Sequence, residues 1–471
     1  MLRSNISSAC DLAVIGSGPG GCAAALAASR RGLRVRLIER ADVGGVCLNV
    51  GCIPTKALVS VASFLRQLRH ASRLGLVVQD ARIDYPAVHA RNERIVMTLR
   101  RGLSDLLSRE KVELIPGHAV FEDSHHLLVT RGQQRELLEA QHVIIATGAS
   151  PSPGPWTFDE QRILSYRGVL SLRAQPVSLL IIGGGVIGCE FASLFAAFGT
   201  AVTIVEQQER LLPAEDPDAV RWLTRRFQAE GITVLTGMTV SRLHASSDGV
   251  EATLSQGVLV RAQHAVIAIG QRPNVETLQL ASASVRFAHG IEVDQRSRTS
   301  QAHIAAIGDC VEGHGLAHWA SAEGVRAVAG FLGDPVGPLQ SSEIPRVVFT
   351  SPELAHVGPL ESELAGSVRA CRLSFAALGK SACDDETEGF VKLLIDPSTD
   401  RVRGATIVGA HASTLIHAVG LAVAHGITAK QLARTITAHP TWSEGLTETA
   451  ASFYGESLVV ASRAVLGGAV K

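Results

Sequence analysis

The sequence has few aromatic residues and no excess of charge of either sign. Phe, Trp and Tyr make up 4% of its 471 residues, and 44 basic side chains balance 44 acidic ones. Proteins that bind nucleic acid or an anionic membrane surface usually carry a basic excess, because it attracts phosphate groups. The balance therefore argues against nucleic acid and membrane lipids as partners, and we expect a small soluble one.

Long apolar segments are also scarce. The first residues lead into an expected strand at residues 11–15 without the apolar stretch of a secretory signal. We find no uninterrupted apolar run long enough to span a membrane, and we therefore expect a cytoplasmic protein. A hydrophobic fraction of 46% nevertheless indicates a globular chain throughout. Its length predicts roughly two to four domains.

Only one pair among the eight cysteines has an informative spacing. Cys47 and Cys52 lie between glycines at the start of an expected helix. Residues so spaced cannot form a disulfide along one face of a regular helix, but Gly51 permits a distorted first turn and Pro54 suits an early helical position. A helix N-terminus also favours a thiolate, so the pair predicts a redox-active disulfide.

Two other interpretations of this pair stay open, namely buried thiols under a glycine turn and one half of a metal site. No second cysteine pair or histidine cluster offers the remaining ligands. We therefore expect no metal centre.

A strand–glycine turn–helix–strand pattern occupies residues 11–39 and predicts a dinucleotide-binding βαβ unit. Gly16 makes the turn, Gly18 lets a pyrophosphate approach the backbone, and Gly21 lets the helix pack closely on the strand. The helix N-terminus faces the phosphates, and Glu39 at the end of the second strand can bind ribose hydroxyls.

The same pattern returns at residues 179–206, where Gly183, Gly185 and Gly188 precede a second strand that ends at Glu206. One glycine fingerprint also arises for packing reasons alone, but two complete copies predict two dinucleotide sites. The carboxylate of Glu206 binds a free 2′-hydroxyl and repels a 2′-phosphate, so NAD is favoured over NADP.

Three further apolar strands end at small or acidic residues, where a bound dinucleotide needs close backbone approach. They end at Thr147-Gly148, at Gly270 and at Asp309. Asp309 can bind a sugar hydroxyl of a flavin, or it can simply cap the following turn.

From about residue 344 the pattern changes to alternating strands followed by helices, which predicts an α+β domain. Near its end, His439 precedes a proline and Glu444 begins the next expected helix. The acid can fix the tautomer of the imidazole and raise its basicity, which predicts a catalytic base. The alternative is a structural histidine with Glu444 as a helix-start charge.

With these motifs in place, the chain resembles the FAD-dependent pyridine nucleotide-disulfide oxidoreductases, and within that family it is most similar to the dihydrolipoyl dehydrogenases. The resemblance covers most of the chain. It rests on residues 16–21, 44–56, 183–190, 307–309, 316–318, 350–353 and 439–444.

The resemblance implies an α/β fold with two Rossmann-like domains, for FAD and NAD, and a C-terminal α+β dimerisation domain. The implied FAD domain covers residues 1–150 and is completed by a central segment, 272–343. The NAD domain covers 151–271 and the interface domain 344–471.

The resemblance also implies which residues bind the cofactors. The FAD contacts are Gly16, Gly18, Gly21, Glu39, Gly45, Lys56, Ala119, Thr147, Gly148, Asp309 and Ala317. The NAD contacts are Gly183, Gly185, Val186, Ile187, Gly188, Glu206, Val240 and Gly270.

The implied catalytic residues are Cys47, Cys52, Lys56, Glu190, His439 and Glu444. In the implied homodimer, His439 serves the disulfide of the partner subunit, and Lys56 approaches the flavin while pairing with Glu190. The implied activity is the oxidation of protein-bound dihydrolipoamide with NAD⁺. The lipoylated carrier would belong to a 2-oxo acid dehydrogenase complex or a glycine cleavage system. The alternative is an NAD(P)H-dependent reductase of another disulfide or of a metal ion.

Overall fold

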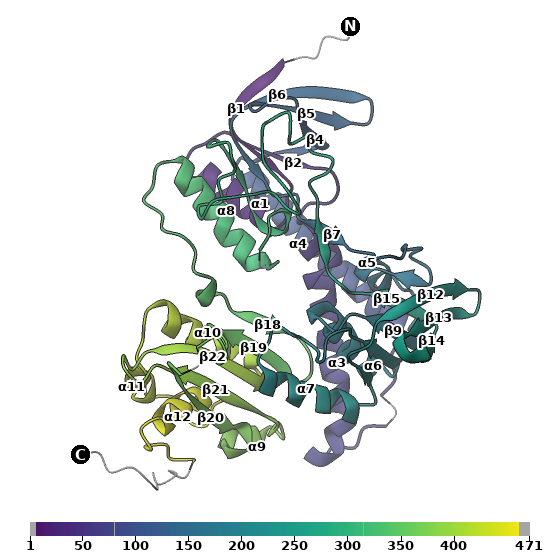
Figure 1. The fold of residues 1–471 in the computed structure, drawn as a ribbon, viewed down its shortest axis with the longest axis vertical. Helices are drawn as coiled ribbons and strands as arrows, with labels where there is room; N and C mark the ends of the chain where they lie inside the picture. Colours follow the sequence, from purple (N-terminus) through teal and green to yellow (C-terminus); the bar gives the residue numbers. More distant parts are fainter. Residues whose placement is uncertain (1–5, 80, 314, 365, 461–471) are drawn as a thin grey trace.

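The computed structural model describes residues 6–79, 81–313, 315–364 and 366–460. It contains three main sheets, of which Figure 1 shows the first at the top, the second at the right and the third at the lower left. The predicted fold class, two Rossmann-like units and an α+β unit, is confirmed. The ends of the expected first and third domains, residues 1–5 and 461–471, lie outside the described residues.

The first sheet is a parallel core extended by an antiparallel pair. Its order is β3-β2-β1-β6-β5-β4, and β17 pairs with β6. Its parallel strands are β1 (Ile6–Ile15), β2 (Val35–Glu39), β3 (Glu113–Pro116), β6 (Gln134–Ile145) and β17 (Ile304–Ala306). The antiparallel strands are β4 (His118–Phe121) and β5 (His126–Arg131).

Helix α1 (Pro19–Arg30) follows β1 through the first glycine turn and packs against α8 (Ala317–Phe331), which comes from far along the chain. Gly324 makes this packing possible, because a Cβ there would lie 2.5 Å from the carbonyl oxygen of Gly20. Residues 304–331 therefore return to the first sheet after the chain has built the second.

The second sheet is parallel throughout, in the order β11-β10-β9-β15-β8. Its strands are β8 (Ile163–Leu164), β9 (Ser178–Ile182), β10 (Ala201–Val205), β11 (Thr233–Leu235) and β15 (His264–Ile267). A small antiparallel sheet beside it consists of β12 (Val240–Ser246), β13 (Gly249–Leu254) and β14 (Leu259–Ala262). The helices are α5 (Tyr166–Leu170), α6 (Val186–Phe198) and α7 (Pro217–Ala229).

The two crossings between the first and second sheets pair with each other. They form the short antiparallel ribbon of β7 (Ala149–Pro151) and β16 (Gln271–Pro273). This ribbon places the two nucleotide-binding units side by side.

The third sheet is antiparallel, in the order β18-β19-β22-β21-β20. Its strands are β18 (Arg346–Val348), β19 (Glu353–Val357), β20 (Arg369–Ser374), β21 (Gly389–Ile395) and β22 (Val402–Gly409). Its helices are α9 (Gly379–Cys383), α10 (Ala412–Ala424), α11 (Ala429–Ala433) and α12 (Glu444–Ser452).

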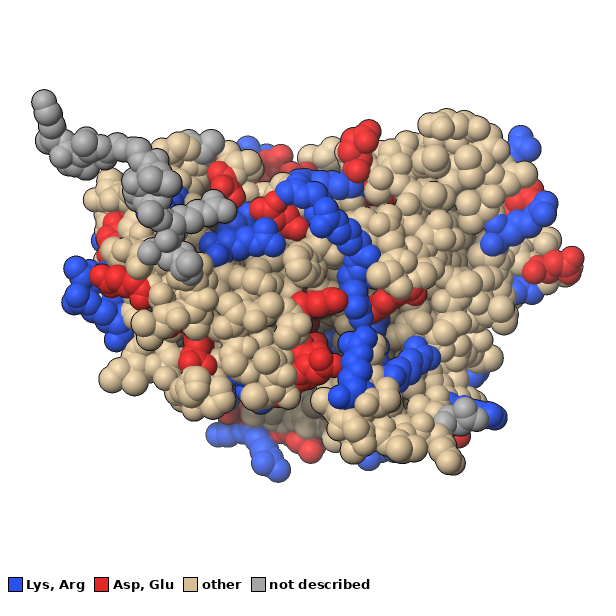
Figure 2. All heavy atoms as spheres, turned by 90° about the horizontal axis from the view of Figure 1, so that it is seen from below, with Lys and Arg blue, Asp and Glu red and all other residues tan. Residues whose placement is uncertain are grey.

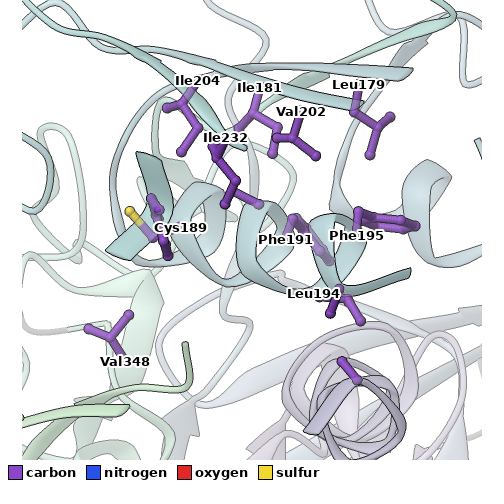
Figure 3. Packing of buried hydrophobic residues seen from close by; sticks show 14 of the residues in the cluster. Leu179, Ile181, Cys189, Phe191, Leu194, Phe195, Val202, Ile204, Ile232 and Val348 are labelled. Carbon is purple, nitrogen blue, oxygen red and sulfur yellow. The ribbon is translucent and has the colours of Figure 1, made fainter. Parts of the chain in front are cut away.

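The largest apolar core lies around α6 and joins all three parts of the chain. Figure 3 shows Phe191 and Phe195 of α6 between the strands of the second sheet and a neighbouring helix, with Val348 of β18 nearby. The same cluster includes Leu58 and Leu65 of α3 (Cys52–His70). Helix α3 is therefore anchored at the junction of the three units.

The prediction concerned uninterrupted apolar runs, and one helical run interrupted by Asn49, Thr55 and Lys56 still passes a looser test of length and composition. The helical run Gly45–Leu74 is long and apolar enough to cross a membrane by length and composition. Gly51 interrupts this run. Three of the run's side chains, Cys47, Cys52 and Lys56, line a cavity. Of its apolar window 22% is buried, and Leu58 and Leu65 of this run pack in the cluster around α6, so part of its apolar surface serves packing between units.

Charged side chains of both signs are present on the face shown in Figure 2. A band of Lys and Arg crosses this face with acidic side chains alongside, and uncharged residues cover most of it. This mixed arrangement agrees with the balanced composition.

Candidate functional site

One cavity of about 1670 Å³ runs between the first and second sheets and reaches β18 of the third. Both glycine turns, the cysteine segment and the residues before β19 line it. Its volume, and lining residues drawn from both nucleotide-binding units, suit two extended ligands rather than one small molecule.

The two glycine turns have matching geometry. Gly16 (φ +103°) and Gly183 (φ +109°) adopt backbone conformations that favour glycine, and a Cβ would lie 2.3 and 2.4 Å from carbonyl oxygens of Ala146 and Ala268. At Gly18 and Gly185, by contrast, a Cβ would meet nothing within 4 Å. The open positions face the cavity, where a pyrophosphate can approach the helix N-termini.

The third glycine of each fingerprint serves packing only. A Cβ at Gly21 or Gly188 would lie 1.9 or 2.0 Å from the oxygen of the first glycine. Neither residue lines the cavity. These two predicted cofactor residues therefore shape the turn from behind the cavity wall.

The acids at the strand ends are buried and held by the glycine turns. Glu39 accepts hydrogen bonds from the Ser17 amide (2.9 Å) and hydroxyl (2.7 Å), and Glu206 accepts one from the Gly184 amide (2.6 Å). Each also accepts an amide two residues later in the chain. Both carboxylates line the cavity in positions that can receive ribose hydroxyls.

The cysteine segment is two helices rather than one. The short helix α2 (Gly45–Val50) contains Cys47, and α3 begins at Cys52, with Gly51 (φ −136°, ψ −111°) between them. A Cβ at Gly51 would lie 2.9 Å from the oxygen of Val46, so the break needs a glycine. Both thiols are free and line the cavity.

The two thiols differ strongly in acidity. The hydrogen bond with Cys47 lowers the pKa of Cys52 to about 7 against the opposing effect of burial, and the nearby Lys56 ammonium lowers it further. The same hydrogen bond and burial raise the pKa of Cys47 far above its ordinary value. Of the two thiols, Cys52 is therefore the more readily ionised.

Lys56 forms an ion pair between units. Its Nζ lies 2.8 and 3.0 Å from the carboxylate oxygens of Glu190 on α6, whose side chain is 5% exposed. Glu190 also accepts a hydrogen bond from the Phe349 amide, and Lys56 lies over the Phe349 ring. One residue from each of the three units thus meets beside Cys52.

His439 and Glu444 form a pair away from this cavity. His439 Nδ1 lies 2.8 Å from Glu444 Oε1, and the Thr441 amide donates to the other oxygen. Burial raises the pKa of Glu444, but these hydrogen bonds lower it below its ordinary value. The His439 side chain is 77% exposed and does not line the cavity, so the described part of the chain does not bring it to Cys47.

Most of the other predicted cofactor-binding residues line the cavity. Asp309 lines the cavity in a short 3-10 turn (Gly308–Cys310), and burial raises the pKa of its carboxyl. The remaining lining residues among the predictions are Gly45, Ala119, Thr147, Gly148, Ala317, Val186, Ile187, Val240 and Gly270.

Several contributors were not predicted. Ser17 anchors Glu39, and Asn49 on α2 accepts a hydrogen bond from Arg100 of α4 (Tyr85–Arg109) at 2.9 Å. Tyr166 lines the cavity with a buried hydroxyl that has no hydrogen-bond partner among the described residues. Ser17 lies inside the glycine fingerprint and could have been found there, whereas the others depend on contacts between distant segments.

The residues present fit FAD and NAD. Two helix N-termini open onto one cavity, each with a glycine that leaves room for a pyrophosphate and a buried acid for a ribose. No group of three or more His, Cys, Asp or Glu that could hold a metal ion occurs within residues 6–79, 81–313, 315–364 and 366–460.

Comparisons with known proteins agree with this arrangement. The model of a family described as pyridine nucleotide-disulphide oxidoreductase matches residues 10–324, and the model of its dimerisation domain matches residues 344–450. The dihydrolipoyl dehydrogenase of Geobacillus stearothermophilus is 37% identical over 445 residues, 93% of this chain and 94% of that protein. That of Chlorobaculum parvum is 39% identical over 451 residues, 93% of this chain and 96% of that protein.

Solved structures are similar over the same extent. LpdA from Mycobacterium tuberculosis has a TM-score of 0.90 and 31% identity, covering 94% of this chain and 99% of that one. The Cu(II) complex of the HOCl-induced flavoprotein disulfide reductase RclA from Escherichia coli has a TM-score of 0.85 and 27% identity, with the same coverage.

Proposed function

The chain belongs to the pyridine nucleotide-disulphide oxidoreductase family, and from this premise we propose that it oxidises protein-bound dihydrolipoyl groups with NAD⁺, using FAD as its resident cofactor. The observation that carries the proposal is the cysteine pair at the centre of a cavity with two dinucleotide-binding turns. The curated relatives described above are named dihydrolipoyl dehydrogenases. Glu206 supports NAD⁺ over NADP⁺ as the acceptor.

We assign the first half of the reaction to three side chains. His439 of the partner subunit, oriented by Glu444, takes the proton of one substrate thiol. The resulting thiolate attacks Cys47, which breaks the Cys47–Cys52 bond and releases Cys52 as a thiolate. The second substrate thiol then displaces Cys47 and its proton passes to the Cys47 sulfur, so the substrate leaves as a disulfide and the cysteine pair is reduced.

We assign Lys56 and Glu190 to the second half of the reaction, in which electrons pass from the reduced cysteine pair to NAD⁺. The Lys56 ammonium holds negative charge on Cys52, and Glu190 keeps the ammonium in place across the junction of the units. A bound FAD would supply two-electron transfer between the reduced cysteine pair and NAD⁺. The residues of the first fingerprint, with Asp309, would hold FAD, and those of the second would hold NAD⁺.

The proposal extends to assembly and location. The match to the family's dimerisation domain supports a homodimer. Exposed groups near His439 agree with this, because Ile436 is 98% exposed and such a large apolar side chain is suited to burial by a partner. We further propose a lipoylated carrier domain as the protein partner, a cytoplasmic location, and domain boundaries at residues 150, 271 and 343.

Turnover of dihydrolipoamide tests the function directly. The purified flavoprotein should reduce NAD⁺ with free dihydrolipoamide and faster, at equal concentration, with a reduced lipoylated carrier domain. The similarity to RclA makes reduction of another disulfide the second candidate. No NAD⁺ reduction by dihydrolipoamide, together with NADH oxidation by another disulfide, would reject the leading proposal in favour of the second.

A further inference from the structure

Lys392 is a buried cation on β21 that contacts the NAD-binding unit. Its side chain is 5% exposed, and its Nζ lies 2.6 Å from Asp216, 2.9 Å from Asp218 and 3.1 Å from Glu361. Burial lowers the pKa of Lys392, but the hydrogen bonds with the acids outweigh it and raise the pKa above its ordinary value. The ammonium is therefore charged and fully paired inside the protein.

Asp216 is the most buried of these acids, with 2% of its side chain exposed, and it has a second task. Its Oδ1 accepts hydrogen bonds from the amides of Asp218 and Ala219, which caps the N-terminus of α7. Its Oδ2 faces Lys392. One carboxylate thus fixes the start of α7 against the third sheet, beside which α7 lies in Figure 1.

The loop before Asp216 packs on the NAD-binding turn. The Glu215 amide donates to the Leu212 oxygen, and the Leu212 amide donates to the Gly184 oxygen, each at 2.9 Å. Leu211 fills the space over Gly184, where a Cβ would lie 2.5 Å from its side chain. The Gly184 amide in turn donates to Glu206. A continuous series of contacts therefore links Lys392 to the acid expected to bind the ribose.

The third sheet holds this loop at a second point. Arg346 Nε of β18 lies 3.2 Å from Glu215 Oε1, and an Arg346 terminal nitrogen donates to the Ala214 oxygen. Glu215, Arg346 and Pro213 line the cavity. The loop of residues 211–216 is therefore a wall of the dinucleotide site that the third sheet supports from outside.

We propose that Lys392, acting through Asp216, is a positioning residue for NAD⁺. It keeps residues 211–216 in the arrangement that places Gly184 and Glu206 for the dinucleotide. The inference rests on the proposed function for the identity of the two substrates, dihydrolipoamide and NAD⁺. It predicts that the cluster affects the NAD⁺ half of the reaction and leaves the thiol half unchanged.

The test uses Asp216→Asn in the full-length FAD-loaded enzyme, because asparagine keeps the helix cap and loses the charge toward Lys392. Rapid mixing measures the two halves separately, as reduction by dihydrolipoamide and reoxidation by NAD⁺. We expect the KM for NAD⁺ to rise roughly three- to thirtyfold, the range of indirect coupling effects, while reduction by dihydrolipoamide keeps its rate.

Glu388→Gln is the matched control. It removes the ion pair of Glu388 with Arg226 on α7, whose charged atoms lie 3.4 Å apart. This pair joins the same two units but does not contact the loop of residues 211–216. This variant should keep the wild-type KM for NAD⁺. A second readout is hydrogen exchange of the Leu212 amide, which should speed up in Asp216→Asn and stay unchanged in Glu388→Gln.

Lys392→Met provides the second variant and should raise the same KM. An unchanged KM together with unchanged exchange at Leu212 would overturn the proposal, as would an equal loss in both half-reactions. If neither variant yields folded flavoprotein, the cluster is a structural requirement and the positioning role is rejected. A wild-type enzyme that dihydrolipoamide does not reduce would instead reject the proposed function, and NADH titration of the variants would still test the loop.

Discussion

Cys52 is placed where its charge can be controlled by its neighbours. It begins α3, receives a hydrogen bond from Cys47 and lies near Lys56, while Glu190 opposes these effects by raising its pKa. The balance leaves the pKa at about 7. A thiol that titrates near neutrality can serve both as leaving group and as electron donor within the cell's ordinary pH range.

The first prediction concerns the ionisation of Cys52 in the two-electron-reduced enzyme. The group is a thiolate above its pKa, so the thiolate should be lost as the pH falls through about 7. The long-wavelength absorption of a thiolate beside oxidised flavin measures it. Lys56→Met removes a group that lowers this pKa, and the midpoint should move to higher pH.

Cys52→Ser is the control, because it lacks the sulfur and should show no such absorption at any pH while FAD stays bound. Cys47→Ser should retain the band, since the thiolate is assigned to Cys52. A band that persists in Cys52→Ser, or a midpoint that Lys56→Met does not move, would contradict the assignment of the thiolate.

The residues of the glycine fingerprint can be predicted from the sequence, whereas contacts between distant residues cannot. The positions of Gly16, Gly18 and Glu39 follow from the fingerprint, since local spacing decides them. The contact of Lys56 with Glu190 joins residues 134 apart. Only the family resemblance suggested that contact, and nothing suggested Phe349, which completes it.

At the scale of elements, the glycines of each strand–turn–helix unit have different roles. Gly183 needs a positive φ and has no room for a Cβ, whereas Gly185 has an ordinary φ of −75° and open space at the cavity. Within one three-residue turn, Gly183 is therefore required for the backbone conformation, whereas Gly185 leaves space for the ligand.

The second prediction exploits this contrast. Gly183→Ala should lower the free energy of unfolding by roughly 2–4 kcal/mol, because the methyl group meets the Ala268 oxygen and the backbone conformation disfavours it. Gly185→Ala should change stability by less than about 1 kcal/mol but weaken NAD⁺ binding about tenfold, because its methyl group projects toward the cavity.

Thermal denaturation and calorimetric titration with NAD⁺ measure the two effects. Gly199→Ala is a useful reference, since its positive φ at the end of α6 strains a side chain while only Gln175 lies near it. A Gly185→Ala variant with a clearly lowered melting temperature and normal affinity for NAD⁺ would contradict the assignment of Gly185 to ligand binding.

The apolar strands were predictable because buried parallel strands read as short continuous runs, such as Leu179–Ile182. The break at Gly51 was suggested by the cysteine spacing, but its division into two helices depends on packing of Gly51 against Val46. The ribbon of β7 and β16 could not be predicted, since its strands lie 120 residues apart and have no local pattern.

At the scale of the whole molecule, the base and the cysteine pair lie apart within one chain. Cys47 lines the internal cavity, while His439 lies exposed on the C-terminal unit. The family resemblance already implied that His439 serves the disulfide of the partner subunit, and the described part of one chain does not bring the two groups together. A dimer that supplies His439 from its second subunit resolves this separation.

Mixing two inactive variants tests whether the site is shared. A Cys47→Ser subunit keeps His439, and a His439→Gln subunit keeps both cysteines. If the base comes from the partner, a heterodimer has one complete site, the cysteines of one chain with the imidazole of the other. Unfolding and refolding an equal mixture should then restore about a quarter of wild-type activity, since half of the dimers are mixed and each has one of two sites.

If His439 acted within its own subunit, no combination of these chains would contain a complete site and the mixture would stay inactive. A mixture of Cys47→Ser with the double variant Cys47→Ser/His439→Gln provides the control, because it lacks Cys47 in every subunit. Recovery of activity only in the first mixture, in proportion to the heterodimer measured by native mass spectrometry, would show that two chains form each catalytic centre. The exposure of His439 and Ile436 in one chain would then reflect a surface that the second chain covers.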